Sequence, residues 1–520
     1  GDRRDRHPAP HVRPLPVPLP STVRPGWRRP GRRSDAVIQA SNSGKARAAS
    51  NAGPSDPKTR IVVLGGGFGG VYTARHLEKL CVRRPDVEIV LASRDNFFLM
   101  YPLLFEVCSG TLETRHCCVP IRAFLRTARF VEATVHRIDL DRRVVHAAAL
   151  EGEAYELPYD QLVLALGAMT NEKVIPGSES AFTFKTLADA VVLRNHLIER
   201  FERADVEADP GRKRRLLTIV VIGGGLVGVE LFGELTAFVD EIIQFYGHVG
   251  RDEVRFLLLQ AVDRIMPEID PELADYATRV LTARRGVEVR TIAPVQAVEP
   301  GKVHLKGETI EAGTIVLAAG IVPNPVVADL PVEKDRRGHI VVDATMQSKG
   351  HPELWALGDC AFVPAPDGKP YPALAQHALH EAKVLARNIH AVLNGKPPEP
   401  FVYHTVGLMG SLGHKKGLAQ VLKVRLRGFP AWWVRRTYYL SQMPGWGRRM
   451  RIMIDWTFAL LFRADIAKID LASERALLSH NGAAGAIPAG NQTGIGGPCA
   501  RPADASPGPS DVQPLAEERV

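Results

Sequence analysis

Two glycine-rich motifs of the form Gly-x-Gly-x-x-Gly carry the clearest chemistry in this sequence of 520 residues. They are Gly65-x-Gly67-x-x-Gly70 and Gly223-x-Gly225-x-x-Gly228. In such a motif the first glycine allows a tight turn, the second lets the backbone approach a pyrophosphate, and the third lets a helix pack closely on a strand. The free N–H groups and the dipole at the start of that helix favour the anion. Each motif therefore predicts a dinucleotide site.

Both motifs stand in the surroundings that this chemistry needs. The segments RIVVLGGGFGGVYTARHLEKL at 60–80 and LTIVVIGGGLVGVELFGELTAF at 217–238 each begin with β-branched residues and continue into a helix-forming stretch. The second is apolar enough to suggest a membrane span, but its three consecutive glycines, with Glu230 and Glu234, favour strand, turn and helix. Two dinucleotides in one chain suggest hydride transfer between a nicotinamide and a flavin.

The elements that must position these sites are those of open parallel sheets, because β-like runs alternate with helical stretches. Such runs lie at 60–64, 217–222 and 315–318. We expect an α/β fold with two Rossmann-like dinucleotide-binding domains. The Pro- and Arg-rich leader at 1–58 and the Gly-, Ala- and Pro-rich tail at 473–520 are expected to be disordered.

The positive charge of the chain does not indicate nucleic acid as a partner. Residues 1–60 hold 13 Lys and Arg against 4 Asp, which accounts for the whole formal net charge of +9. The rest of the chain is balanced, so no basic domain is expected.

The region 421–470 combines aromatic residues with cations. It holds ten Lys and Arg against three Asp, and it includes Trp432, Trp433, Trp446 and Trp456. Both features suit the headgroup zone of a membrane. The run RIMIDWTFALLF at 451–462 is too short and too charged to span a bilayer, so we expect a helix that lies in the interface. Its apolar side would comprise Met450, Met453, Thr457 and Leu460 or Leu461. A dimerisation helix, and hence a homodimer, is the alternative.

The six cysteines form no CxxC pair and show no spacing typical of zinc or of a disulfide framework. No metal site is therefore expected, and a reducing cytoplasm is the simplest location. No secretory signal is recognisable near the N-terminus. Together with the 421–470 region, this predicts a cytoplasmic protein bound peripherally to the inner face of the cell membrane.

Further segments carry a resemblance to known proteins. YDQLVLALGA at 159–168, VLAAGIVPNP at 316–325 and LWALGDCA at 354–361 resemble flavoproteins with two dinucleotide-binding domains. More specific segments resemble the type II NADH dehydrogenases, which are single-subunit, non-proton-pumping NADH:quinone oxidoreductases of the membrane surface. These segments are NFFLMYPLLFEVCSG at 96–110, GVELFGEL at 228–235 and AQHALHEA at 375–382. The resemblance implies FAD in the first site, NADH in the second, and a quinone as electron acceptor.

The resemblance also implies a domain order and a set of cofactor contacts. The order is an FAD-binding domain at 59–190 and 336–420, an NAD(P)H-binding domain at 191–335, and a membrane-anchor region at 421–472. The contacts expected for FAD are Gly65, Gly67, Phe68, Gly69, Gly70, Ser93, Arg94, Val135, Gly167, Asp359, Ala378 and Lys416. Those expected for NAD(P)H are Gly223, Gly225, Gly228, Gln260 and Gly320. Asp359 would hydrogen-bond the ribityl chain of FAD.

Three side chains are candidates for catalysis. Glu230 matches a family glutamate between the nicotinamide and quinone sides of the flavin, and Gln376 matches a glutamine that lines the quinone pocket. His380 could donate to a quinone oxygen or deliver a proton near neutral pH, and it is equally consistent with a surface histidine. The pair His380-Glu381 replaces the Gln-Gln of many members, which weakens the quinone assignment but neither cofactor.

The sequence also departs from the family at the two acids that bind ribose. Ser93, followed by Arg94, stands at the first position, and Gln260 stands at the second. A neutral amide repels a 2′-phosphate less than a carboxylate does, so we expect weaker discrimination between NADH and NADPH. Because no cation follows at 261 or 262, NADH remains the first choice.

Other functions of related folds stay open at this point. A disulfide or sulfide oxidoreductase would need paired cysteines, but Cys108 has Glu113 five residues on, and Cys117 and Cys118 are adjacent. A reductase of a ferredoxin- or rubredoxin-like carrier would use the basic 421–470 region to dock an acidic partner. A redox sensor would bind NAD(P)H and turn over slowly.

Overall fold

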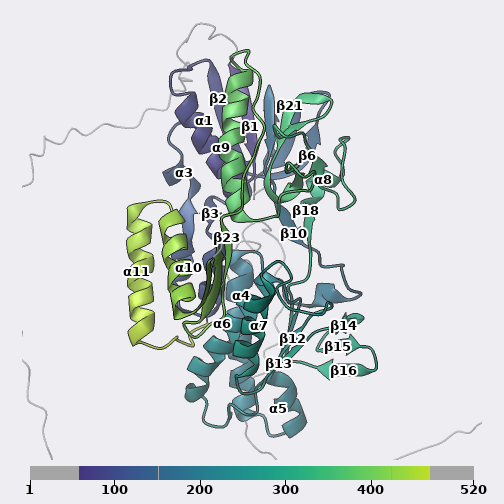
Figure 1. The fold of residues 1–520 in the computed structure, drawn as a ribbon, viewed down its shortest axis with the longest axis vertical. Coiled ribbons are helices and arrows are strands. Elements are labelled where there is room, and N and C mark those ends of the chain that lie inside the picture. Colours follow the sequence, from purple (N-terminus) through teal and green to yellow (C-terminus); the bar gives the residue numbers. More distant parts are fainter. Residues whose placement is uncertain (1–57, 150–151, 423, 469–520) are drawn as a thin grey trace, which may run out of the picture. The chain divides into compact units, whose positions relative to one another are not determined.

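The structure is a computed structural model that describes residues 58–149, 152–422 and 424–468 (Figure 1). All of them belong to one unit of the chain, residues 56–520. The leader and tail for which we expected disorder lie outside the described residues, except for Lys58.

The first glycine-rich motif follows a strand of a six-stranded sheet whose order is β20-β21-β9-β1-β2-β5. All neighbours are parallel except β20 and β21, which are antiparallel. The strands are β1 (Thr59–Leu64), β2 (Val87–Ser93), β5 (Arg129–Glu132), β9 (Gln161–Leu164), β20 (Gln347–Ser348) and β21 (His351–Ala356). The last four residues of β1, IVVL, are fully buried, as expected of a parallel strand covered on both faces. Two distant segments of the chain therefore build this sheet.

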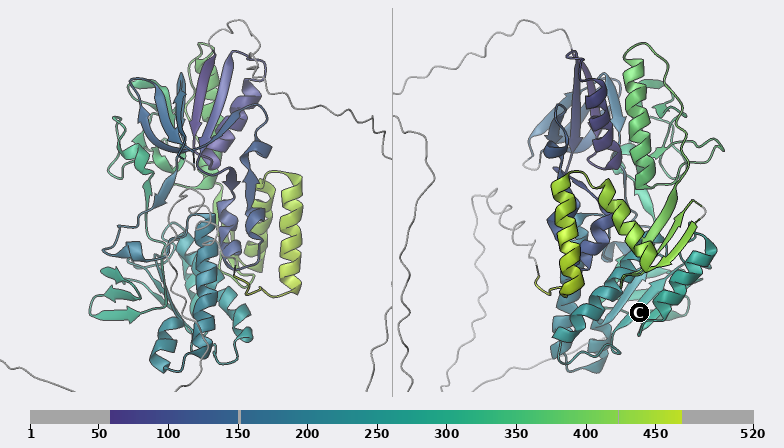
Figure 2. Two further views of the ribbon diagram at one scale, coloured as in Figure 1. Left: turned by 180° about the vertical axis from the view of Figure 1, so that it is seen from behind. Right: turned by 60° about the vertical axis from the view of Figure 1, so that its left-hand side comes forward.

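Two long helices pack side by side against this sheet (Figures 1 and 2). They are α1 (Phe68–Leu80), which follows the first motif, and α9 (Ala375–Val392). A small antiparallel sheet is inserted between β5 and β9. Its strands are β6 (Thr134–Asp139), β7 (Val144–Ala148) and β8 (Ala154–Pro158).

The second motif follows β11, a central strand of a four-stranded parallel sheet whose order is β13-β12-β11-β17. The strands are β11 (Thr218–Ile222), β12 (Arg255–Leu259), β13 (Val287–Arg290) and β17 (Thr314–Leu317). The helices around it are α4 (Leu187–Val206), α5 (Pro210–Leu216), α6 (Leu226–Ile242) and α7 (Pro271–Thr282). The segment that could have been a membrane span thus forms strand β11, a turn and helix α6. This confirms the predicted strand, turn and helix.

One face of the second sheet has its own small core. Val220 and Leu257 pack there against Val303 and Ile310 of a three-stranded antiparallel sheet. That sheet consists of β14 (Ala297–Glu299), β15 (Lys302–Leu305) and β16 (Glu308–Glu311). The opposite face joins the larger core that runs through both halves.

The chain crosses between the two halves near paired short strands, β10 (Ala168–Thr170) and β18 (Ile321–Pro323). After β10, a capping box starts α4: the Thr186 hydroxyl accepts from the Asp189 N–H, and the Asp189 carboxylate accepts from the Thr186 N–H. The expected boundary at 190/191 therefore falls inside a helix that begins at Leu187.

The C-terminal region begins earlier than the expected residue 421. A three-stranded antiparallel sheet comes first, formed by β23 (Gly407–Ser411), β24 (Gly417–Val421) and β25 (Val424–Gly428). Two helices follow, α10 (Phe429–Gln442) and α11 (Trp446–Leu461). The expected boundary between residues 420 and 421 falls inside β24. Since β24 pairs with both β23 and β25, the three strands form one sheet on the C-terminal side. None of the helices in the described residues is long and apolar enough to cross a membrane.

The remaining elements are short. They are β3 (Phe97–Leu99), β4 (Cys118–Pro120), β19 (Ile340–Val341), β22 (Ala361–Phe362), α2 (Leu104–Cys108), α3 (Ile121–Phe124) and α8 (Pro325–Ala328).

Candidate functional site

The three glycines of the first motif are required for different reasons. Gly65 has φ +112°, and a Cβ there would lie 2.2 Å from the carbonyl oxygen of Ala165. A Cβ on Gly70 would lie 1.9 Å from the carbonyl oxygen of Gly65. A Cβ on Gly67 would meet nothing within 4 Å. Packing therefore explains Gly65 and Gly70, whereas Gly67 leaves open space at the start of α1, where a phosphate would approach.

The second motif repeats this pattern. Gly223 has φ +110° and lies against Ala318, and a Cβ on Gly228 would lie 1.9 Å from the Gly223 oxygen. Gly225 is open except for the carboxylate of Glu268, 3.7 Å from its Cβ position. That carboxylate accepts a hydrogen bond of 2.6 Å from the N–H of Leu226, the first residue of α6. An acid of the chain itself thus occupies a donor that an incoming anion would use.

A cavity of about 480 Å³ opens beside the first motif and is lined from both halves of the molecule. The predicted cofactor residues that line it are Gly65, Gly67, Phe68, Gly69, Gly167, Gly320, Asp359 and Ala378. They come from the first glycine-rich loop, the ends of β9 and β17, the turn after β21, and the start of α9. The carboxyl ends of parallel strands meet there, which is where doubly wound folds bind ligands.

The cavity also has walls that the sequence did not reveal. Val227 lines it from α6, Tyr101 lines it from a short 3-10 helix at Tyr101–Leu103, and Lys185 lines it from the loop before α4. The Lys185 ammonium lies 3.6 Å from the Asp359 carboxylate, and the Tyr101 hydroxyl donates to the Phe184 carbonyl at 3.1 Å. Burial, with Glu230 and Asp359 nearby, raises the pKa of Tyr101, so this phenol keeps its proton. The sequence did offer one signal for Lys185. The capping box of Thr186 and Asp189 marks the start of a helix, so Lys185 is the last residue of the loop before it.

The Gly358-Asp359 turn rests on a buried acid. Glu381 of α9 accepts a hydrogen bond of 2.8 Å from the Gly358 N–H. Burial raises the pKa of Glu381 to about 7, with the Gly358 N–H opposing that shift and Asp359 adding to it. Glu381 therefore lies beneath the turn that presents Asp359 and is not among the residues that line the cavity.

Gln376 and His380 of α9 do not line the cavity. The Gln376 amide donates to the Gly407 carbonyl at 2.9 Å and accepts from the Tyr403 hydroxyl at 3.4 Å. His380 is exposed and stacks on Tyr403, with ring centroids 4.1 Å apart. Together with Tyr403 they form a patch where α9 meets β23.

Five predicted FAD contacts do not line the cavity. Gly70 packs behind the loop, and Ser93 lies beside it, because a Cβ on Gly66 would come 2.5 Å from the Ser93 hydroxyl. Arg94 is exposed and pairs with Asp95 at 2.9 Å. Val135 is buried in β6. Lys416 lies in the turn between β23 and β24, which packs against Gly233 in the middle of α6 rather than against its cavity end. The structure therefore does not support a cavity contact for these residues.

Gln260 lies where the ribose-binding acid was expected, at the end of β12, but its amide is engaged within the second loop. It accepts from the Gly224 N–H at 3.1 Å and donates to the Arg264 carbonyl at 3.2 Å. The sequence pattern drew attention to 261 and 262 for a cation. The structure brings the backbone carbonyl of Arg264 to this loop, whereas the Arg264 guanidinium donates to the Pro267 carbonyl at 2.8 Å.

Glu230 lies one turn after Val227 on α6, inside a buried cluster of acids and arginines. Its carboxylate accepts from the Ser411 N–H at 2.8 Å and from the Arg435 guanidinium at 2.9 Å. Arg435, which is 1% exposed, also reaches Glu106 at 3.3 Å. Burial raises the pKa of Glu230, and Arg435 opposes that shift. Sequence reasoning missed both Arg435 and Glu106, because three distant segments assemble this cluster.

The cysteines are poor candidates for disulfide chemistry. Cys108, Cys117, Cys118 and Cys360 are all buried and free, as is Cys81. Burial raises the pKa of the Cys108 thiol, and burial raises the pKa of Cys360 to about 11, so neither is a ready thiolate. Over the described ranges, no group of His, Cys, Asp and Glu is arranged to hold a metal ion. Cys499 lies outside those ranges.

Comparison with known proteins agrees with this geometry. Residues 59–382 match the pyridine nucleotide-disulphide oxidoreductase family. The chain is 31% identical over 422 residues to a type II NADH:quinone oxidoreductase of Mycobacterium tuberculosis, covering 77% of this chain and 88% of that protein. It is 31% identical over 379 residues to the type II NADH:quinone oxidoreductase of Staphylococcus aureus, covering 71% and 92%.

Solved structures show the same fold. NDH2 from Plasmodium falciparum in complex with NADH aligns with a TM-score of 0.73 at 19% identity, over 79% of this chain and 100% of that chain. A sulfide:quinone oxidoreductase of Aquifex aeolicus aligns with a TM-score of 0.58 at 19% identity, over 76% and 92%. The sequence matches go further than the fold, and on their strength the chain belongs to the pyridine nucleotide-disulphide oxidoreductase family and, within it, to the type II NADH:quinone oxidoreductases.

Proposed function

We propose that this chain oxidises NADH and reduces a membrane quinone, using FAD held in the cavity of about 480 Å³. The observation that carries the proposal is that one cavity is lined by the first glycine-rich loop and Asp359 from one half, and by Val227 and Gly320 from the other. A flavin there lies within reach of a nicotinamide on the second half. The family membership supports the same activity.

The residues at the first loop fit FAD. The open space at Gly67 and the free N–H groups of α1 suit its pyrophosphate, and Asp359 suits the hydroxyls of its ribityl chain. Lys185 holds the Asp359 carboxylate from the other side of the cavity. Ser93 beside Gly66 is placed to bond the adenosine ribose, whereas Asp95 takes up the charge of Arg94. When bound, FAD would accept a hydride and pass two electrons on.

The second loop is the proposed NAD(P)H site. Gly225 leaves room for a pyrophosphate at the start of α6, and Gly320 lines the cavity on the side where the nicotinamide would enter. Because Gln260 is uncharged and the Arg264 guanidinium is engaged by the Pro267 carbonyl, we expect NADPH to be accepted less well than NADH but not excluded.

The quinone side is proposed to use Glu230 for protons. Val227 lines the cavity, and Glu230 follows it by one helical turn, so a proton held on Glu230 is near the flavin region without being in water. Arg435 fixes the orientation of this carboxylate. We propose that Gln376 and His380 line the path by which a quinone reaches the flavin. Both lie near the start of α9, close to Ala378, which lines the cavity.

We further propose that α11 lies in the surface of the inner face of the cell membrane. Trp446, Met450, Ile454, Phe458 and Leu461 recur every three or four residues along α11, and all are exposed. This stripe differs from the predicted one, because Ile452 and Trp456 face the protein and set the rotation of the helix. A dimer formed through α11 is the alternative, and sedimentation in detergent-free buffer over a range of concentrations distinguishes the two.

Anaerobic stopped-flow absorbance of the flavin tests the function. NADH or NADPH is mixed with the enzyme, and menaquinone and ubiquinone analogues are then added. We expect rapid flavin reduction by NADH and rapid reoxidation by a quinone. Reduction without reoxidation by either quinone would contradict the proposed acceptor while leaving the NADH site intact.

A further inference from the structure

Four of the ten cations of residues 421–470 are paired with acids of the protein. Arg435 and Arg436 bond to buried Glu106. The guanidinium of Arg436 also lies between the rings of Trp432 and Trp456, at 4.2 and 4.7 Å from their centroids. Arg425 and Arg427 pair with acids that begin α7, and Arg448 and Arg449 donate to backbone carbonyls. Part of the basic charge read from this part of the sequence is therefore taken up within the protein, while Arg451, Arg463 and Lys468 remain exposed without an ion pair in the described residues.

Further unpaired cations stand on the two helices that cover the first sheet. We call this group the α1–α9 ridge, and it consists of Arg75, Lys79, Lys383 and Arg387. None of the four forms an ion pair with a residue that the structure describes. In each helix the two cations are four residues apart, which puts them on one side of it.

Neither α1 nor α9 supplies an exposed acid to balance the ridge. The acid of α1, Glu78, is buried and accepts from the N–H groups of residues 126–128. The acid of α9, Glu381, is buried beneath Gly358. His76 lies among the ridge cations, and its pKa is lowered to about 4 by burial and then by Lys79, Lys383, Arg75 and Arg387. Such a concentration of like charge is unfavourable unless an anion is bound.

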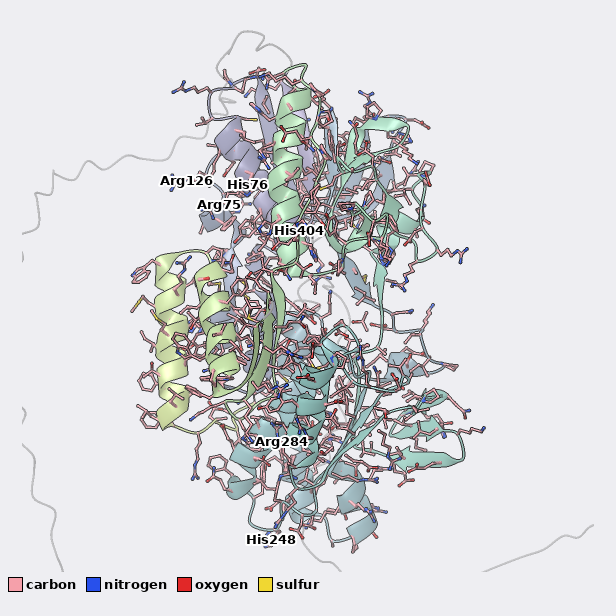
Figure 3. All side chains as sticks on the ribbon, viewed as in Figure 1. Arg75, His76, Arg126, His248, Arg284 and His404 are labelled. Carbon is pink, nitrogen blue, oxygen red and sulfur yellow. The ribbon has the colours of Figure 1, made fainter. Side chains whose placement is uncertain are left out.

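The ridge continues onto α11. Burial raises the pKa of Tyr72, and the charges of Arg75 on α1 and Arg449 on α11 both oppose that shift, which places both cations in the surroundings of this hydroxyl. In the right-hand view of Figure 2, α1 and α9 lie above α10 and α11 on the same side of the molecule. Figure 3 labels Arg75, His76 and Arg126 directly above α10 and α11. A basic surface therefore adjoins an apolar one.

We propose that the α1–α9 ridge binds the headgroups of anionic lipids, so that the ridge and the exposed stripe of α11 form one membrane-docking surface. This rests on the proposed function at the membrane. A lipid surface fits the pattern because it offers many negative charges beside an apolar layer, which matches cations beside Phe458 and Trp446. His380 is on the same side of α9 as Lys383 and Arg387, so this orientation turns the proposed quinone path toward the bilayer.

The test compares two triple variants that each remove three exposed cations from the full-length protein. The ridge variant is Lys79→Gln/Lys383→Gln/Arg387→Gln. The control is Arg212→Gln/Arg214→Gln/Arg215→Gln on α5, at the opposite end of the described residues (Figure 1). Arg75 is left unchanged, since its guanidinium packs on the Phe124 ring at 4.3 Å. Binding is measured by flotation with vesicles of phosphatidylglycerol and of phosphatidylcholine.

Each cation near an anionic surface contributes about fivefold in binding, so we expect the ridge variant to bind phosphatidylglycerol about a hundredfold more weakly. The control should bind like the parent protein, and neither should change on phosphatidylcholine. Equal losses in the two variants, or no loss in the ridge variant, would overturn the proposal. So would ridge-dependent binding to an acidic protein carrier with unchanged vesicle binding.

Turnover with a water-soluble short-chain quinone separates this proposal from the proposed function. We expect both triple variants to keep that turnover, which also shows that they are folded. If the parent protein reduces no quinone, the proposed function is wrong. If ridge substitution still weakens vesicle binding in that case, the proposal that the ridge binds lipid headgroups remains valid. An α11 variant, Trp446→Ser/Phe458→Ser/Leu461→Ser, should weaken binding to both kinds of vesicle.

Discussion

Arg435 is the residue on which the buried cluster depends. It bonds Glu230 and Glu106 and also donates to the Pro102 carbonyl at 2.7 Å. Replacing it with methionine leaves the buried carboxylate of Glu230 without its cation and that of Glu106 with Arg436 alone, so Arg435→Met should lower the free energy of unfolding by about 3–5 kcal/mol. Urea denaturation measures this. Arg425→Met, which breaks an exposed pair with Asp270, should cost less than about 1 kcal/mol, and equal losses would contradict the assignment.

The same arginine should set the pH dependence of quinone reduction. Burial raises the pKa of Glu230 and Arg435 opposes it, so removing the arginine raises that pKa further. In Arg435→Met, the pH profile of flavin reoxidation by quinone should therefore shift upward, while flavin reduction by NADH stays unchanged. A shift in both half-reactions would show a general structural effect instead.

Glu268 should weaken binding of the nicotinamide dinucleotide. Its carboxylate accepts from the Leu226 N–H at 2.6 Å, and a pyrophosphate must compete for that donor against a like charge. Because a charge at a helix start is worth roughly 1 kcal/mol, Glu268→Gln should lower KM for NADH about fivefold with kcat unchanged. Asp263→Asn is the matched control, since it removes the same charge from the neighbouring loop without touching α6. An equal fall in KM in the control would point to the net charge alone.

At the scale of elements, Glu381 makes the Gly358-Asp359 turn sensitive to pH. The folded pKa of Glu381 is about 7, above its value of 4.5 in an unfolded chain, so the folded state binds this proton more tightly. The associated stability is complete below about pH 4.5 and is lost as pH rises to about 7, a change of about 3 kcal/mol. Glu381→Gln keeps an acceptor for the Gly358 N–H and does not titrate.

The melting temperature of the parent protein should thus fall between pH 5 and pH 7.5 relative to that of Glu381→Gln. Glu311→Gln, on the exposed edge strand β16, is the control and should follow the parent. Parallel curves for all three proteins would mean that Glu381 does not titrate in this range.

The elements were predictable where the signal is local. β1, β11 and β17 start and end within a residue or two of the predicted runs, because consecutive β-branched residues ending at glycine define a buried strand. The exposed side of α11 was not predictable. Trp456 faces inward because its indole N–H donates to Glu106 at 2.5 Å, and that acid lies 350 residues earlier in the chain.

At the scale of the whole molecule, the candidate site also has parts that could be predicted from local sequence and parts that could not. The glycine-rich loops and the Gly358-Asp359 turn could be predicted, because each is a short motif with its own backbone geometry. Tyr101 and Lys185 could not, since only the folded chain brings their loops to the cavity. The resemblance assigned Lys416 to FAD by position in the sequence, but its turn packs against the middle of α6.

Charge shows the difference most clearly. The sequence places a surplus of cations at 421–470, whereas the folded molecule buries or pairs four of these ten and gathers further unpaired cations on the α1–α9 ridge. The attraction to anionic lipids should therefore belong to one face of a chain that is nearly neutral beyond its leader. Salt screens such a face, because the Debye length falls from about 10 Å at 0.1 M to about 3 Å at 1 M.

Turnover should consequently depend on salt only when the acceptor is in an anionic membrane. With a long-chain quinone in phosphatidylglycerol vesicles, raising the salt concentration should slow turnover several-fold, because the enzyme leaves the surface. With a short-chain quinone in water, the rate should hold, since that acceptor reaches the enzyme without docking on a bilayer. Phosphatidylcholine vesicles are the control for the lipid phase. An equal slowing with the soluble quinone would place the salt effect in the catalytic steps and not in docking.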